Sequence, residues 1–92
     1  MEYLSRVLKM DPLFVPGYNG LAEIYILGSF FGKVPPNMGY PKAEEYAEKA
    51  LEIDNNFSDA YRILGAVQMY YNWDWEAAED HLEHAIRLNP NS

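Results

Sequence analysis

His81 and His84, with Asp80 beside them, come closest in this sequence to a set of reactive side chains. Residues three apart share one face of a helix, so both imidazoles could in principle reach one metal ion. Two ring nitrogens without a thiolate make a poor transition-metal site, and the chain has no cysteine. No set of a nucleophile, a base and an orienting group is visible either. We therefore expect no enzyme, no bound metal and no cofactor.

The composition narrows the function classes further. A chain of 92 residues with 49% apolar and 23% charged residues should fold as one domain at most. Seven Lys and Arg against fourteen Asp and Glu leave a net charge of −7, which offers no basic face to nucleic acid or an anionic membrane. Apolar runs are short, as in Ile24 to Leu27, so neither a membrane span nor a signal-peptide core is predicted. We expect a cytoplasmic protein that binds neither nucleic acid nor membrane.

The chain aligns with itself. Three stretches match without gaps and each reads as a helix that ends at Asp or Asn: Glu2 to Pro12, Glu45 to Asn55 and Asp80 to Pro90. The segments that follow the first two also match, because Phe14, Tyr18, Leu21 and Ala22 fall opposite Phe57, Tyr61, Leu64 and Gly65. An internal repeat of two helices is the simplest explanation.

The repeat spacing is 43 residues from Pro12 to Asn55 and 35 residues from Asn55 to Pro90. Both are a period of about 34 residues plus an insertion, and with the bulky, bulky, small pattern this resembles the tetratricopeptide repeat. The resemblance implies an all-α fold: antiparallel helix-turn-helix repeats stacked as a short right-handed solenoid of about five helices. It also implies that small residues sit where the helices of a unit touch, namely Ala22, Ala43, Ala50, Gly65, Ala78 and Ala85.

The predicted organisation has three parts. Residues 1–12 form the second helix of a preceding repeat, 13–55 a repeat with nine inserted residues, and 56–90 a repeat with one. Helices are expected over 2–10, 15–29, 41–53, 58–71 and 75–88, with Pro16 and Pro41 in first turns and Ser58 and Asp74 as N-caps. Without capping elements the array reads as part of something longer, and uncovered apolar residues such as Leu82 and Ile86 could mediate weak self-association.

The nine-residue insertion falls in the stretch 28–41. Its Gly and Pro residues argue against regular structure, while Phe30, Phe31, Met38 and Tyr40 are too many apolar groups for a solvated loop. We expect the stretch to fold back onto the helices. The favoured interpretation is that its rings cover the exposed edge of the short solenoid, and the alternative is that they form a lid or wall of a binding surface.

Two further features have structural as well as functional interpretations. In the repeat alignment His81 takes a half-buried aromatic position and His84 a solvated basic one, which disfavours a metal site. The turn Trp73, Asp74, Trp75 resembles repeats of bacterial multidomain signalling proteins. At least one of the two Trp residues should staple this turn to its neighbour, whereas an exposed Trp would mark a binding hot spot.

The resemblance also implies a ligand surface, because in that family the first helices of successive units line a concave groove. The matching positions here are Asn19, Glu23, Ile26, Leu27, Arg62, Ala66, Met69 and Tyr70. This mostly apolar lining predicts a scaffold for protein–protein interaction that holds a peptide or helix of a partner, and Glu23 disfavours a chaperone C-terminal carboxylate. The alternatives are a structural or self-assembly spacer of a larger signalling protein, or a small-molecule sensor that uses the aromatic insertion 28–41.

Overall fold

The computed structural model describes residues 2–89, and within that range the chain forms five α-helices, one π-helical turn and no strand. The predicted all-α class and the five helices are confirmed. Their bounds are α1 Glu2–Met10, α2 Val15–Phe30, α3 Pro36–Ile53, α4 Ser58–Val67, the π-helical turn η1 Gln68–Asn72 and α5 Trp75–Leu88. None of these helices is long and apolar enough to cross a membrane. Pro90, which ends the third aligned stretch, and Met1 lie outside the described residues.

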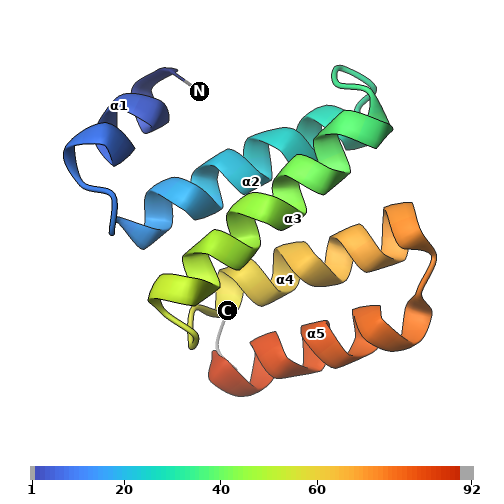
Figure 1. Ribbon diagram of the computed structural model, residues 1–92. Coiled ribbons are helices and arrows are strands. Elements are labelled where there is room, and N and C mark those ends of the chain that lie inside the picture. The colour runs from blue at the N-terminus through green and yellow to red at the C-terminus, as the bar shows by residue number, and fades with distance from the viewer. Residues whose placement is uncertain (1, 90–92) are drawn as a thin grey trace.

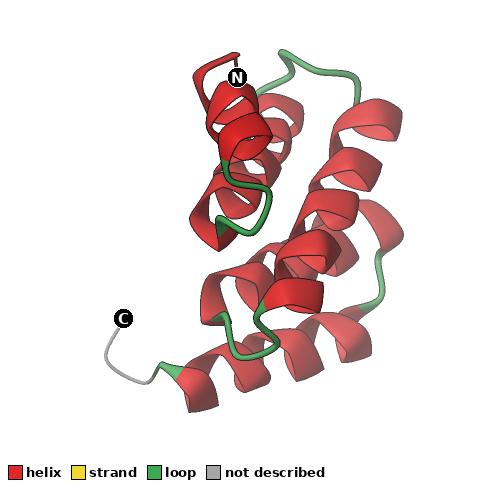
Figure 2. Ribbon diagram, turned by 60° about the vertical axis from the view of Figure 1, so that its left-hand side comes forward, coloured by secondary structure: helices red, strands yellow, loops and turns green. Residues whose placement is uncertain are grey.

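Successive helices run antiparallel and pack side by side (Figure 1). α3 lies against both α2 and α4, α5 lies against α4, and the short α1 lies beside the first half of α2, as Figure 2 shows from a second direction. α2 and α4 also touch each other directly. α3, in the middle of the chain, is therefore covered on two sides, whereas α1 packs mainly against α2, and α5 packs against α4 and the turn η1.

Small residues allow the close packing at the centre. Five alanines have no exposed surface and belong to one buried cluster with larger groups such as Tyr18, Leu64 and Val67. An alanine at a helix contact lets two backbones approach closely, so the larger side chains fill the space around the contact. The fully buried alanines are Ala22, Ala43, Ala47, Ala50 and Ala60.

The sequence repeat is also a repeat of contacts. The hydroxyl of Tyr18 donates a hydrogen bond to the Pro12 carbonyl at 2.9 Å, and at the corresponding position the Tyr61 hydroxyl donates to the Asn55 carbonyl at 3.0 Å. In the same two turns, an aspartate that ends a helix accepts a hydrogen bond from the backbone two residues further on. Each tyrosine ties its helix to the turn that precedes it.

The insertion is more regular than the sequence indicated. The prediction of no regular structure over 28–41 was wrong, because α2 continues to Phe30 and α3 begins at Pro36. Gly32 ends α2 with a positive φ of 77°, and the Lys33 amide donates to the Gly28 carbonyl at 2.7 Å, a glycine-terminated helix end. Pro36 takes the first turn of α3, while Pro41, expected there, lies inside the helix.

Within the two helices the glycines of the insertion serve packing rather than flexibility. A Cβ on Gly28 would lie 2.7 Å from Val34 Cγ2, and a Cβ on Gly39 would overlap the Ser29 hydroxyl. Only a hydrogen fits at these two places, so the connecting segment and the start of α3 can lie close against the end of α2. The sequence rule that glycine breaks a helix failed here because tertiary contacts outweigh local propensity.

The two predicted N-caps differ in outcome. Asp74 caps α5, accepting a hydrogen bond from the Ala77 amide at 3.1 Å, as expected. The prediction that Ser58 caps α4 was wrong: Ser58 is the first residue of α4, and the preceding Phe57 supplies no side-chain cap. The helix predicted over 58–71 also changes type, because α4 ends at Val67 and a π-helical turn follows.

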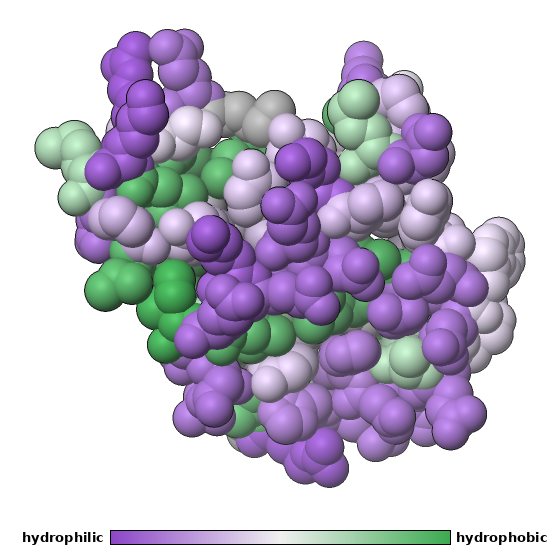
Figure 3. Space-filling model, in the orientation of Figure 1, coloured by the Kyte–Doolittle hydropathy of each residue, from purple (hydrophilic) through white to green (hydrophobic). Residues whose placement is uncertain are grey.

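The surface is mostly hydrophilic on the side shown in Figure 3, over α3 in the middle of the view. Apolar surface gathers toward the left of this view, where α1 meets the start of α2. Exposed apolar groups of this region include Met10, Leu13 and Phe14. The N-terminal edge of the fold is therefore less completely covered than its centre.

Candidate binding groove

Two adjoining hollows, of about 240 and 250 Å³, lie between α2 and α4 and share Ile26, Leu27 and Ala66 in their walls. We call them together the α2–α4 groove. On the α2 side, residues 23, 26, 27 and 30 recur at the spacing of one helix face, and on the other side residues 62, 66 and 70 do the same. The groove therefore exists because α2 and α4 lie next to each other with matching faces toward solvent.

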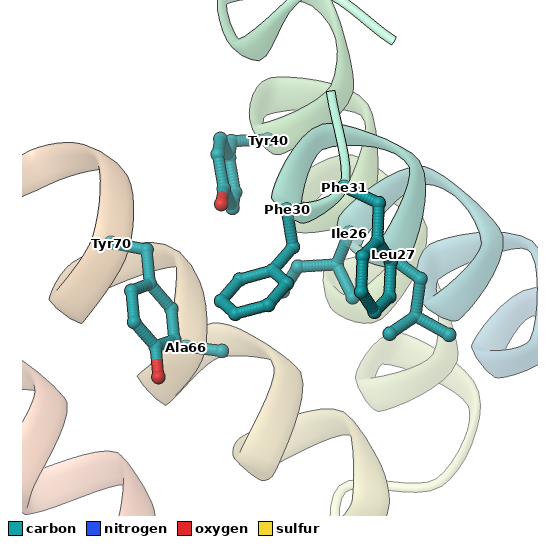
Figure 4. A pocket seen from close by; sticks show the side chains of 7 residues that line it. All are labelled: Ile26, Leu27, Phe30, Phe31, Tyr40, Ala66 and Tyr70. Carbon is teal, nitrogen blue, oxygen red and sulfur yellow. The ribbon is translucent and has the colours of Figure 1, made fainter. Parts of the chain in front are cut away.

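The first hollow is aromatic and aliphatic. Phe30 stands at its centre, with its ring edge-on to Tyr70 at 5.6 Å and to Phe31 at 5.2 Å between centroids (Figure 4). Edge-to-face contacts of this kind hold rings in place without hiding them, and both phenylalanines stay more than half exposed. The complete lining is Ile26, Leu27, Phe30, Phe31, Tyr40, Ala66 and Tyr70. Together these side chains form a largely preformed pocket for an apolar group of a ligand.

Tyr40 belongs to both the core and this hollow. It is only 6% exposed and stacks on Tyr71 with ring centroids 5.4 Å apart. Burial, and to a lesser degree the neighbouring Tyr70, raises the pKa of the Tyr40 hydroxyl, so it stays protonated. Of the insertion's large apolar side chains, Tyr40 therefore folds onto the helices as expected, whereas Phe30, Phe31 and Met38 remain exposed.

The second hollow has polar groups at its rim. Its walls include Glu23 and Arg62, together with Ile63 and Leu82 in addition to the shared residues. The Arg62 guanidinium is paired with Asp59 at 2.8 Å. No group of residues 2–89 forms an ion pair with the Glu23 carboxylate. The free charge at this end of the groove is therefore negative.

The π-helical turn η1 places the aromatic residues of α4's C-terminal end. A π-helical turn takes in one more residue than an α-helical turn, which accommodates the one-residue insertion of the second unit. Tyr70 then lines the groove and Tyr71 stacks on Tyr40. Trp73 ends the turn in a left-handed conformation with a φ of 57°. Although they are adjacent in η1, Tyr70 therefore faces the groove and Tyr71 faces α3.

Two predicted groove residues lie elsewhere. Asn19 is buried, lines neither hollow, and its side-chain oxygen has no hydrogen-bond partner among the described residues. Met69 lines a separate hollow beside α5. Two groove residues were missed: Ile63 and Leu82. The i,i+3 relation of Ile63 to Ala66 could have indicated the first, whereas Leu82 reaches the groove from a different helix.

Neither of the two Trp rings in the turn Trp73, Asp74, Trp75 is buried. Both are more than half exposed, and they contact each other edge-on with centroids 6.3 Å apart. Trp75 lines the same hollow as Met69. We expected at least one Trp to staple the turn to its neighbour, or an exposed Trp to mark a binding hot spot. Both rings are exposed, and no helix of residues 2–89 covers this side of α5.

The two histidines contact one tyrosine. The rings of His81 and His84 lie 6.3 and 4.2 Å from the Tyr61 ring, and a nitrogen of His81 lies 2.9 Å from the Ala77 carbonyl oxygen. The expected solvated position of His84 was wrong, since packing against Tyr61 leaves it half-buried. Across residues 2–89, no three side chains of the metal-binding types gather at one point.

Comparison with known proteins finds a weak similarity to a transcriptional regulator. No family model matches the chain. The transcriptional regulator HilA of Salmonella typhimurium and that of Salmonella typhi are each 29% identical to it over 72 residues, which is 78% of this chain. The matched region is 13% of the length of each regulator, so the chain corresponds to a small part of these relatives.

Proposed function

We propose that this chain is a helical-repeat scaffold that binds a peptide or helix of a partner protein in the α2–α4 groove. The observation that carries the proposal is the row of exposed aromatic and aliphatic side chains along one preformed hollow. Phe30, Phe31, Leu27 and Tyr70 are each at least half exposed and converge on the same space. Clustered exposed apolar groups of this kind are typical of protein interaction sites.

We further propose that the helices form a short right-handed solenoid of tetratricopeptide type. The repeated tyrosine bonds at Tyr18 and Tyr61 support this, as do buried small residues at most of the positions where the repeat pattern requires them. In such an arrangement α2 and α4 are equivalent helices, and a ligand would lie across both. The groove then belongs to the repeat architecture, and the stretch 28–41 adds the rings of Phe30, Phe31 and Tyr40 to its wall.

The shape and charge of the groove suggest the kind of ligand. One bulky apolar side chain would fill the hollow around Phe30, and a Lys or Arg of the ligand would meet the unpaired Glu23 carboxylate. Seven residues separate Glu23 from Phe30 along α2, which is about 10 Å at 1.5 Å per residue. A cation and an apolar anchor about three residues apart in an extended peptide, or two turns apart in a helix, would span that distance.

The similarity to HilA supports a place for such a scaffold inside a larger regulatory protein. HilA is a transcriptional regulator, and this chain matches only 13% of its length. A net charge of −7 makes direct contact with nucleic acid unfavourable for this segment. Its contribution to a regulator would then be contact with another protein.

Peptide titration followed by backbone amide chemical shifts tests the proposal. Peptides with one Phe or Leu anchor and a Lys three residues away should shift amides of α2 and α4, and Leu27→Glu should weaken binding at least about tenfold. Leu13→Glu, an exposed apolar position outside the groove, is the matched control and should bind as the wild type does. Shifts confined to α3 and α5, or equal effects of both variants, would contradict binding in the groove.

A further inference from the structure

The outer face of α5 is an uncovered apolar surface that adjoins the α2–α4 groove at Leu82, which lines both. A hollow of about 320 Å³ runs along it, lined by Met69, Trp75, Leu82 and Ile86 among others. Ile86 is 62% exposed and Trp75 is 58% exposed. No described helix lies over this face, because α5 packs chiefly against α4 and η1 on its other side.

The same positions of α3 are covered by a helix. In the repeat alignment Trp75 corresponds to Tyr40, Leu82 to Ala47 and Ile86 to Leu51. Tyr40 is stacked on Tyr71 of η1, and Ala47 has no exposed surface. This repeat face therefore docks a helix on α3, whereas on α5 no helix of residues 2–89 covers it.

The α1–α2 contact shows which kind of helix packs against this repeat face when the face carries large residues, as it does on both α1 and α5. Leu4 and Leu8 of α1 occupy the positions of Leu82 and Ile86. A Cβ on Gly20 would lie 3.0 Å from Leu4 Cδ1, and a Cβ on Gly17 would lie 2.9 Å from Leu8 Cδ2. The leucines thus rest directly on the glycine backbone of α2.

Residue sizes on the two facing helices are complementary at each junction. Where α3 presents the small Ala47, α4 carries Ala60 and Ile63 at the positions of Gly17 and Gly20. α5 presents Leu82 and Ile86, as α1 presents leucines, and so fits a helix with glycines at an i,i+3 spacing. Among the described helices, α2 has this glycine pair, Gly17 and Gly20, on the face that contacts α1.

We propose that two copies associate head to tail, with α5 of one copy docked on α2 of the next in the place of α1. Leu82 would then rest on Gly20 and Ile86 on Gly17, in the antiparallel order of the α1–α2 contact. A heterologous contact of this type can propagate into chains of copies. On α2 the docking surface around Gly17 and Gly20 differs from the groove face, and on α5 only Leu82 is shared with the groove, so the proposal does not depend on peptide binding.

α1 is weakly held and can be displaced. It has nine residues, none of them buried, and an isolated helix of that length is marginal in water. It also leaves Ile24 of α2 exposed, although Val67 at the corresponding position of α4 is 1% exposed beneath α3. α5, with fourteen residues, extends about five residues further toward its N-terminus and would cover Ile24 as well.

Association of two copies that each carry a net charge of −7 should strengthen with salt, because screening reduces their repulsion. An interaction driven by complementary charges would weaken under the same conditions. The salt response therefore separates docking of apolar faces from electrostatic self-association.

Sedimentation of the full chain between about 10 µM and 1 mM tests the proposal. The wild type should gain average mass with concentration, while Ile86→Glu (altered α5 face) and Ile24→Glu (altered α2 face) should each stay monomeric. An equimolar mixture of the two variants retains one intact pair of faces and should form dimers only. Leu4→Ala, which loosens α1, should tighten wild-type association about tenfold.

Met38→Glu, an exposed apolar position on neither face, is the control and should associate like the wild type, with far-UV circular dichroism verifying the fold of each variant. A wild type that stays monomeric over the whole range would overturn the proposal. So would a mixture of Ile86→Glu and Ile24→Glu that stays monomeric while the wild type associates, or weaker association of Leu4→Ala.

Discussion

The pairs α2–α3 and α4–α5 share one residue pattern but differ in what covers them. Tyr40 and Trp75 occupy the same repeat position at or near the start of the second helix of each pair. Tyr40 is 6% exposed because α4 and η1 lie over α3, whereas Trp75 is 58% exposed because no helix of residues 2–89 lies over that face of α5. Identical positions in a repeat thus become core or surface according to the neighbouring helix, not the residue itself.

We expect this difference to have its largest effect on stability when each of the two aromatic side chains is truncated to Ala. Tyr40→Ala should lower the free energy of unfolding by about 3 kcal/mol, because it leaves a cavity beside Tyr71, whereas Trp75→Ala should change it by less than about 0.5 kcal/mol. Urea unfolding of the two variants measures both values. Equal losses would mean that the cover on α3 contributes nothing to stability.

A smaller effect is expected at the helix starts of the second pair. Asp74→Ala removes the hydrogen bond to the Ala77 amide and should destabilise the chain by about 1 kcal/mol. Ser58→Ala, within the first turn of α4, serves as the matched variant and should be nearly neutral, since no cap is lost. Thermal unfolding followed by circular dichroism gives both values, and a Ser58 variant as unstable as the Asp74 variant would refute this assignment of the caps.

The smallest effect concerns acidic residues along α3. Desolvation, then Glu44 and Glu52, raises the pKa of the Glu48 carboxyl, and His81 opposes the shift. A raised folded-state pKa means that ionised Glu48 destabilises the fold at neutral pH, and this penalty disappears as pH falls from the folded to the unfolded pKa. Glu48→Gln should therefore be slightly more stable than the wild type at neutral pH and equal to it in acid.

Denaturant unfolding at a series of pH values measures that difference. Glu83→Gln is the matched control, because it changes the corresponding position of α5, where Arg87 replaces the third acid. If the two variants showed the same pH-dependent gain, the effect would follow from net charge alone and not from the acidic row on α3.

Much of the fold was predictable from the sequence. The three aligned stretches located α1, α3 and α5, and the aspartate or asparagine at each end marked where those helices stop. Asp74 as a cap followed from its place before an amphipathic helix. These features depend on residues close together in the chain, which is why local rules were sufficient for them.

Other features depended on contacts between distant residues. Gly28 and Gly39 are residues that usually disfavour a helix. Both nevertheless lie in helices, at places where only a hydrogen fits against Val34 and Ser29. The π-helical turn that separates Tyr70 from Tyr71 was not visible in the residue pattern, nor was the contribution of Leu82 to the groove. Such outcomes require the three-dimensional neighbours of each residue.

The sequence by itself determined the all-α class, the order of the helices and which positions are equivalent in the repeat. The tertiary structure alone decided which of those equivalent positions are buried, because burial depends on whether another helix lies over a face. For the same reason it decided that Phe30 and Phe31 form an exposed wall of the α2–α4 groove, while Tyr40 from the same insertion became part of the core.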